Sequence, residues 1–216
     1  MAEALIKQAN ALRVEENNTD AGATFMKAAE SFLQQDVESI DAASAYVSAA
    51  NCYVDGRYSE AVRILHLAID IYVKKGMFSL AAEHLQYIGD THPDMEESLD
   101  HYKKASKFYK IINATSRWAR CTSEAATVCG KLKRYEEAIE LFESAAVASL
   151  KNPLLKWGAR NLLLKAILCR RVLGNKQDVA EAMKKYQEWD PTIALATHQE
   201  PDAWSILIMG RIKEDN

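Results

Sequence analysis

The feature that most constrains the fold is an internal repeat of small and bulky apolar residues. A small residue is followed twelve positions later by alanine, four further on by a large apolar residue, and three further on by another alanine. Complete copies are Ala9, Ala21, Phe25, Ala28; Ala49, Ala61, Leu65, Ala68; and Ala126, Ala138, Phe142, Ala145. Partial copies are Ser98, Tyr102, Ala105 and Val179, Met183, Tyr186. The copies recur every 37 to 41 residues, which is the length of a helical hairpin repeat.

The same pattern indicates how each repeat folds. Only eight glycines and four prolines interrupt the chain, and Val, Ile and Thr never alternate with polar residues as they do in strands. Alanine at fixed positions lets two helices approach closely, while the bulky residue fills the space toward the next hairpin. We therefore expect an all-α fold, a right-handed tetratricopeptide-like (TPR-like) solenoid of about ten helices in hairpins.

Turn signals place the boundaries of these hairpins. The stretches Asp55–Tyr58 and Lys131–Tyr135 each precede a second helix, and Lys75-Gly76 and Gly174-Asn175 each end a helix. The second helices open with the acidic residues that a helix N-terminus favours, Glu60, Glu97, Glu136 and Glu137. We predict a single superhelical domain over 1–216, in which 189–216 begin a C-terminal helical region. The predicted hairpins are 1–35, 39–75, 78–111, 116–150 and 153–188.

Composition narrows the class of protein. The chain has 216 residues, 49% of them hydrophobic and 26% charged, as in an ordinary soluble domain. Its net charge of -3 offers no general attraction to nucleic acid or to an anionic membrane. It contains no run of 18 apolar residues and no apolar signal segment at its start, so a soluble cytoplasmic protein is expected. Its four cysteines include no CxxC pair, which favours packed thiols in a reducing compartment.

The sequence gives no support for catalysis or for a cofactor. No glycine-rich phosphate loop of the GxGxxG or GxxxxGK[ST] type occurs. The five histidines lack metal-binding spacing, and none lies at a zinc interval from a cysteine. No nucleophile stands beside a base, and no paired carboxylates are apparent. We therefore expect a non-enzymatic protein with no catalytic residue, no metal and no cofactor.

One segment, NPLLKWGARNLLLKAILC (Asn152 to Cys169), carries an unusual series of basic residues. Proline in its first turn predicts that a helix opens there. Lys156, Arg160 and Lys165 are four and five residues apart, and we expect them along one side of that helix. They form either a solvated stripe or a basic strip that binds an acidic partner.

This segment resembles the signature of the soluble NSF attachment protein (SNAP) family, alpha type, which carries a similar S-P-L-L-K-[YF]-x-A-K stretch before an apolar helix ending in A-L-C. Four further stretches resemble successive hairpins of that family, in the same order and with nearly the same spacing. They are AGATFMKAAESF (21–32), DAASAYVSAANCY (41–53), EAVRILHLAIDIYVKKGMFSLAAEHL (60–85) and RYEEAIELFESAA (134–146).

The resemblance implies a function and a set of contact residues. SNAPs are adaptors that lay a concave face on the four-helix SNARE bundle (syntaxin-type) and recruit the NSF AAA ATPase, which takes the bundle apart in vesicle fusion and intracellular protein transport. They are cytoplasmic and peripheral on endomembranes, through their partners. Because SNARE bundles are acidic on their flanks, basic residues on the inner face suit salt-sensitive binding. The matching positions here are Arg120, Lys156, Arg160 and Lys165.

Several positions depart from the family pattern. Glu83 and Glu124 stand where the family has lysines, and Met77 replaces an arginine, which implies weaker binding or a bundle with a different charge pattern. The resemblance also implies that this chain lacks the family's N-terminal membrane loop and its C-terminal ATPase-activating end.

Two other functions remain open. A generic TPR-like scaffold would bind an extended peptide or a partner helix in its concave groove, with Asn10, Asn51, Lys165 and Arg170 available for polar contacts. An RNA-binding helical repeat would need a positively charged groove, and the acidic net charge argues against it.

Overall fold

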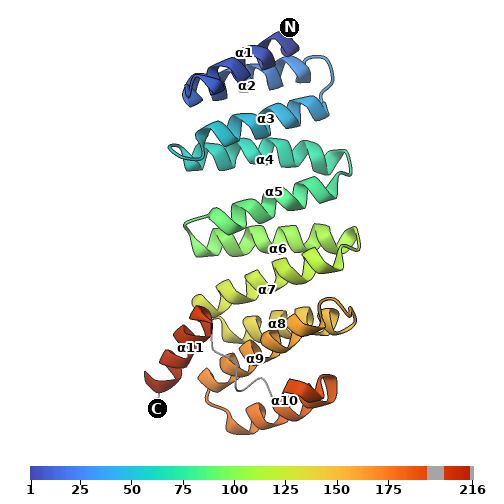
Figure 1. Cartoon of the computed structure of the whole chain (residues 1–216), viewed down its shortest axis with the longest axis vertical. Helices are drawn as coiled ribbons and strands as arrows, with labels where there is room; N and C mark the ends of the chain where they lie inside the picture. Colours follow the sequence, from blue (N-terminus) through green and yellow to red (C-terminus); the bar gives the residue numbers. More distant parts are fainter. Residues whose placement is uncertain (194–201, 215–216) are drawn as a thin grey trace. The chain divides into compact units, whose positions relative to one another are not determined.

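The computed structural model describes residues 1–193 and 202–214 of the chain. These residues form eleven α-helices, and short connections join consecutive helices from α1 to α10 (Figure 1). The helices are α1 (Ala2–Val14), α2 (Asn18–Leu33), α3 (Ile40–Tyr53), α4 (Tyr58–Lys74), α5 (Phe78–Thr91), α6 (Met95–Ile111), α7 (Thr115–Lys131), α8 (Tyr135–Leu150), α9 (Lys156–Val172), α10 (Lys176–Trp189) and α11 (Ala203–Glu214). The predicted all-α fold is confirmed.

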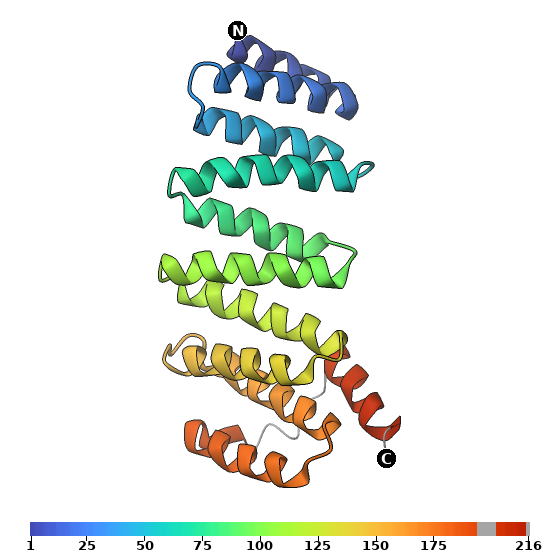
Figure 2. The ribbon, with the colours of Figure 1, turned by 180° about the vertical axis from the view of Figure 1, so that it is seen from behind.

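The chain divides into two compact units, Met1–Ile88 and Gly89–Asn216. In the first unit, α1 to α4 lie side by side in chain order (Figures 1 and 2). The repeat alanines of this unit are buried, as the pattern predicts, and Phe25 and Leu65 are each 2% exposed between them. Gly22 is required by close packing, because a Cβ there would lie 2.6 Å from Cζ of Tyr53.

In the second unit, α6 to α9 again follow one another in chain order, and α11 lies against the end of α7 (Figure 2). Ala126, Ala138 and Ala145 are buried around Phe142, which is fully buried. Trp204 of α11 packs edge-on against Phe142, with 5.3 Å between ring centroids. The repeat therefore supplies a core onto which a helix outside the repeat also packs.

The ends of the helices follow the turn chemistry expected from the sequence. Gly76 and Gly174 have φ values of 70° and 79°, the left-handed conformation that ends α4 and α9. Asp94 caps α6, because its carboxylate accepts hydrogen bonds from the backbone N–H groups of Glu96 and Glu97 at 2.9 and 3.0 Å. The predicted helix start at Pro153 is wrong: residues 151–155 form turns, and α9 begins at Lys156.

Candidate partner-binding surface

The turn before α9 exposes two large apolar side chains. The side chain of Asn152 accepts a hydrogen bond from the N–H of Leu154 at 3.0 Å, and its carbonyl accepts from Leu155 and Lys156. This tight turn leaves Leu154 90% exposed and Trp157 81% exposed. Such exposure is high for leucine and tryptophan and makes this turn a candidate contact surface. We call Leu154, Lys156, Trp157 and Arg160 the α9 patch.

Trp157 also lines a small hollow of about 200 Å³, together with Pro153, Lys156, Arg160, Asp190 and Thr192. Arg160 lies over the ring of Trp157, 5.6 Å from its centroid, and donates a hydrogen bond to the hydroxyl of Thr192. Its Nε is 3.6 Å from Oδ2 of Asp190, and the two side chains are only 15% and 3% exposed. Lys156 is exposed at the rim, with no ion pair among the described residues.

The surroundings of Asp190 favour the ionised form of its carboxyl group. Burial alone would raise the pKa of its carboxyl. Hydrogen bonds from the hydroxyl and N–H of Thr192, together with the charges of Arg160 and Lys156, lower this pKa below its usual value. Arg160 therefore faces a carboxylate, and this ion pair fixes the segment after α10 to the start of α9.

Lys165 has a different internal partner. Its Nζ is 2.8 Å from Oδ2 of Asp202 and 5.2 Å from the ring centroid of Trp204, and its side chain is 12% exposed. Burial would raise the pKa of Asp202, but hydrogen bonds from Lys165 and Ser205 lower it overall. This ion pair ties the start of α11 to α9.

The expectation that three basic residues line one side of α9 is wrong. Nine residues separate Lys156 from Lys165, and at 100° per residue they point in opposite directions. The contacts agree, since Arg160 faces the segment after α10 while Lys165 faces α11. Lys156 and Arg160, one turn apart, share the hollow.

Arg120, on α7, is well exposed. Its side chain is 64% exposed, and its Nη2 lies 3.9 Å from Oδ2 of Asp90. That carboxylate also accepts a short hydrogen bond, 2.6 Å, from the hydroxyl of Tyr102. The pair with Asp90 is long and exposed, so Arg120 can exchange it for an outside partner at small cost.

The three departures from the family pattern also lie where a partner can reach them. Glu83 is exposed, and Met77 and Glu124 are partly exposed. Glu124 follows Arg120 by one turn of α7 and places an acidic group beside it.

Leu154 and Trp157 were not among the residues predicted for the site. The sequence offers one weak indication of them. Ala159, Leu163 and Ala166 belong to the buried stripe of α9, and neither Leu154 nor Trp157 belongs to it. A leucine and a tryptophan beside a prolyl turn and outside the core periodicity indicate a contact surface.

Three of the four cysteine thiols lie in the core. Cys121, Cys129 and Cys169 are buried and form no disulfide with a described residue, and burial raises the pKa of each thiol to about 12. They pack as small apolar residues, as predicted. Within the part of the chain that the structure describes, no helix is long and apolar enough to cross a membrane.

Solved structures with similar folds come from repeat proteins. A STAND-type signal transduction ATPase with a tetratricopeptide repeat sensor, from Pyrococcus horikoshii, aligns with a TM-score of 0.54 at 18% identity, covering 99% of this chain and 36% of that one. BtubC from P. vanneervenii aligns with a TM-score of 0.52 at 13% identity, covering 93% of this chain and 82% of that one. At these identities the likeness concerns the fold alone.

Sequence comparison is more specific. Residues 1–200 match the family model described as soluble NSF attachment protein, SNAP. The beta-soluble NSF attachment protein of Bos taurus is 32% identical over 189 residues, 86% of this chain and 63% of that protein. A probable vesicular-fusion protein sec17 homolog of Schizosaccharomyces pombe is 34% identical over 197 residues, 89% of this chain. The chain spans 63% and 68% of the lengths of these two relatives. The family model covers almost the whole chain, and this chain therefore belongs to the soluble NSF attachment protein family.

Proposed function

We propose that this chain is a non-enzymatic adaptor of vesicle fusion, which binds an assembled SNARE bundle and links it to the NSF-type AAA ATPase. Membership of the SNAP family supports this role in general terms. The observation that carries it for this chain is the exposure of Leu154 and Trp157 beside Lys156. A surface with two exposed apolar side chains and a cation suits a partner whose acidic outer surface also carries some apolar side chains.

The four basic residues contribute unequally in this proposal. Arg120 and Lys156 are exposed and supply the charge that meets the acidic bundle. Arg160 and Lys165 already face Asp190 and Asp202 inside the chain, so they have less charge to offer an outside partner. We infer that they mainly hold the surface in shape, and that their contact with the bundle is secondary.

The link to the ATPase rests on the family alone. The chain covers about two thirds of its relatives, and no described residue identifies an ATPase contact. We propose that binding to the bundle is the activity this chain carries, and that its place on endomembranes is peripheral, through its partners.

The test is binding of the full chain to an assembled, soluble SNARE bundle, with free single SNARE helices as the comparison. Isothermal calorimetry would give the affinity for each. The proposal expects binding that prefers the bundle. Equal binding to single helices, or no binding at low salt, would overturn it.

Variants then separate the patch from the rest of the surface. Replacing Leu154 and Trp157 together by serine is expected to weaken bundle binding at least tenfold, because both anchors are lost. The matched control is Ile111→Ser, since Ile111 is also an exposed apolar residue of the second unit, 59% exposed. For charge, Lys156→Glu is compared with Lys107→Glu, an exposed lysine on α6. An equal loss in the test and control variants would show that the patch is not the contact.

A further inference from the structure

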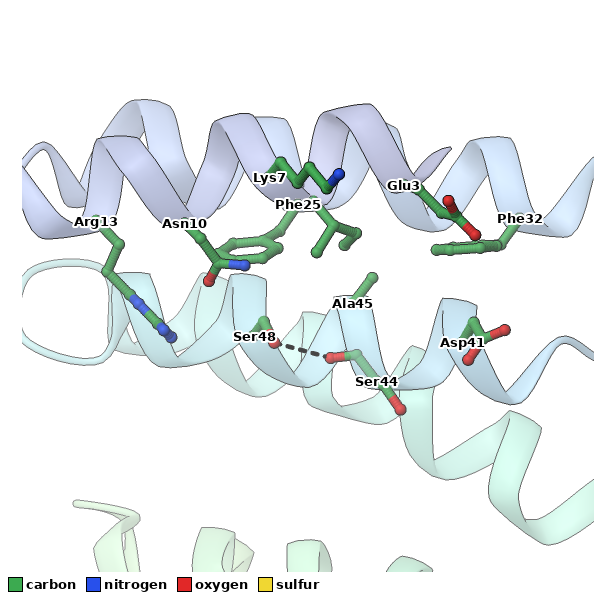
Figure 3. A pocket seen from close by; sticks show the side chains of 11 residues that line it. Glu3, Lys7, Asn10, Arg13, Phe25, Phe32, Asp41, Ser44, Ala45 and Ser48 are labelled. Atoms are coloured by element: carbon green, nitrogen blue, oxygen red, sulfur yellow. Dashed lines mark hydrogen bonds between the residues drawn. The ribbon is translucent and has the colours of Figure 1, made fainter. Parts of the chain in front are cut away.

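The first unit contains a groove whose lining shares no residue with the α9 patch (Figure 3). It has a volume of about 520 Å³ and is open to solvent. One face of α1 forms one wall, α3 forms the other, and two phenylalanines of α2 form the floor. The groove is lined along both walls by residues of successive helical turns, as a groove that holds a segment of a partner chain would be.

The groove is charged in opposite senses at its two ends. Glu3 and Asp41 lie at one end, Arg13 lies at the other, and Lys7 lies between Glu3 and Arg13 on α1 (Figure 3). Ten residues of helix separate Glu3 from Arg13, about 15 Å along the wall. The side chains of Glu3, Asp41 and Arg13 are exposed, and none of the three has an ion pair among the described residues. Charges placed this way can select a ligand that carries basic residues at the end near Glu3 and Asp41 and acidic residues at the end near Arg13.

The floor supplies apolar contact between these ends. Phe32 and Ile6 are half-buried, so each keeps a surface that a ligand can cover. Phe25 is buried beneath Arg13, whose guanidinium lies 6.0 Å from the centre of its ring. A ligand with an apolar stripe can therefore cover the exposed surface of Phe32 and Ile6 while its ends meet the charges.

The walls favour a helical ligand over an extended one. The hydroxyls of Ser44 and Ser48 donate to carbonyls of their own helix, at 3.1 and 3.0 Å. Asn10 is then the one amide side chain lining the groove. An extended peptide would leave most of its backbone groups without partners here, whereas a helix satisfies its own.

We propose that this groove binds a single amphipathic helix of about three turns, contributed by a partner protein. Its apolar stripe lies on Phe32 and Ile6, its basic end lies at Glu3 and Asp41, and its acidic end lies at Arg13. The residues of this groove are not among those assigned above to SNARE-bundle binding, and the test below uses no SNARE protein.

The test uses two labelled, capped 14-residue helical peptides and fluorescence anisotropy with the full chain. Both peptides carry the same leucine stripe. The first has two glutamates in its first turn and two lysines in its last; the second has lysines at both ends. The wild type is expected to prefer the first peptide about fivefold, the value of one exposed charge contact.

A charge-reversal variant tests whether Arg13 sets this preference. Arg13→Glu makes both ends of the groove acidic, so this variant is expected to prefer the peptide with two basic ends. Lys27→Glu reverses an exposed charge elsewhere on α2 and is expected to keep the wild-type preference. Circular dichroism would establish that both variants stay folded.

Three outcomes would overturn the proposal. The first is that neither peptide binds the wild type, and the second is that Arg13→Glu leaves the preference unchanged. The third is self-association of the wild type in sedimentation that Arg13→Glu abolishes, which would assign the groove to a second copy of the chain. Because no SNARE protein is present, a failure here leaves the test of bundle binding untouched.

Discussion

At the scale of single residues, long-range ion pairs decide which charges are available to a partner. Arg160 and Lys165 are polar residues on an amphipathic helix, and by sequence alone they belong to its solvated side. In the structure each meets a carboxylate from a segment that follows α10. Their partners are 30 and 37 residues away in the sequence, so no local pattern could have revealed them.

Glu143 lies at the centre of a polar cluster, and the first prediction concerns the removal of its side chain. Its carboxylate accepts from Arg170 at 2.7 Å, Lys185 at 2.9 Å and Tyr186 at 2.5 Å, and it is 17% exposed. Glu143→Ala leaves the half-buried guanidinium of Arg170 with Asp178 alone. We expect a loss of about 2 kcal/mol in the free energy of unfolding, measured by urea denaturation. Glu140→Ala, an exposed change on the same helix, should cost much less; equal losses would contradict the role of the cluster.

The same carboxylate predicts a dependence of stability on pH. Burial alone would raise the pKa of Glu143, but the hydrogen bonds from Tyr186, Lys185 and Arg170 lower it overall. As pH falls, the unfolded chain therefore takes up this proton first. The stabilisation is complete above about pH 4.3 and is lost as pH falls through the lowered folded pKa. Urea denaturation of wild type and Glu143→Gln from pH 7 to pH 3 should show a gap that narrows only in acid. A gap of constant size would exclude this account.

At the scale of elements, α11 is held by contacts that fall outside the repeat. Trp204 donates a hydrogen bond to the carbonyl of Thr127 at 2.9 Å. Arg211 donates to the carbonyls of Gly130 and Lys131, at 2.8 and 3.2 Å. These carbonyls lie in the last two turns of α7, and that of Gly130 also accepts from the N–H of Lys133 at 3.2 Å. In this way α11 caps the end of α7.

Gly130→Ala tests this docking. A Cβ at Gly130 would lie 2.5 Å from Cζ2 of Trp204, so the indole must move. We expect faster hydrogen exchange of the amides in α11 and a melting temperature lower by a few degrees, as a loss of about 1–2 kcal/mol implies. Gly210→Ala is the control, because an added Cβ there meets no atom within 4 Å. Unchanged exchange in α11 for Gly130→Ala would mean that Trp204 does not anchor the helix.

The sequence predicted the helices well but not the packing of α11 on α7, because local periodicity reveals helices and does not reveal contacts between distant residues. Repeat alanines such as Ala28 and Ala145 report local helix contact, and periodicity makes them visible without knowledge of the fold. Gly130, by contrast, is small because it meets Trp204, a residue 74 positions later that belongs to no repeat. The candidate site divides in the same way. Exposed Lys156 was predicted, while the projecting pair Leu154 and Trp157 depends on the turn at Asn152.

At the scale of the whole molecule, the net charge of -3 opposes approach to an acidic bundle, so attraction must come from a few local cations. Arg120 and Lys156 are both exposed in the second unit. Steering by such charges acts on the association rate and weakens with salt, whereas apolar anchors act on the dissociation rate.

This distinction gives the last prediction. Between 50 and 300 mM salt, the wild-type association rate with a SNARE bundle should fall by about tenfold, measured by stopped-flow fluorescence. The double variant Arg120→Glu/Lys156→Glu should associate more slowly at low salt and lose most of this dependence. Replacing Leu154 and Trp157 by serine should instead speed dissociation and keep the salt dependence of association. If both variants changed the same rate constant in the same way, the cations and the apolar pair would not have separate roles in binding.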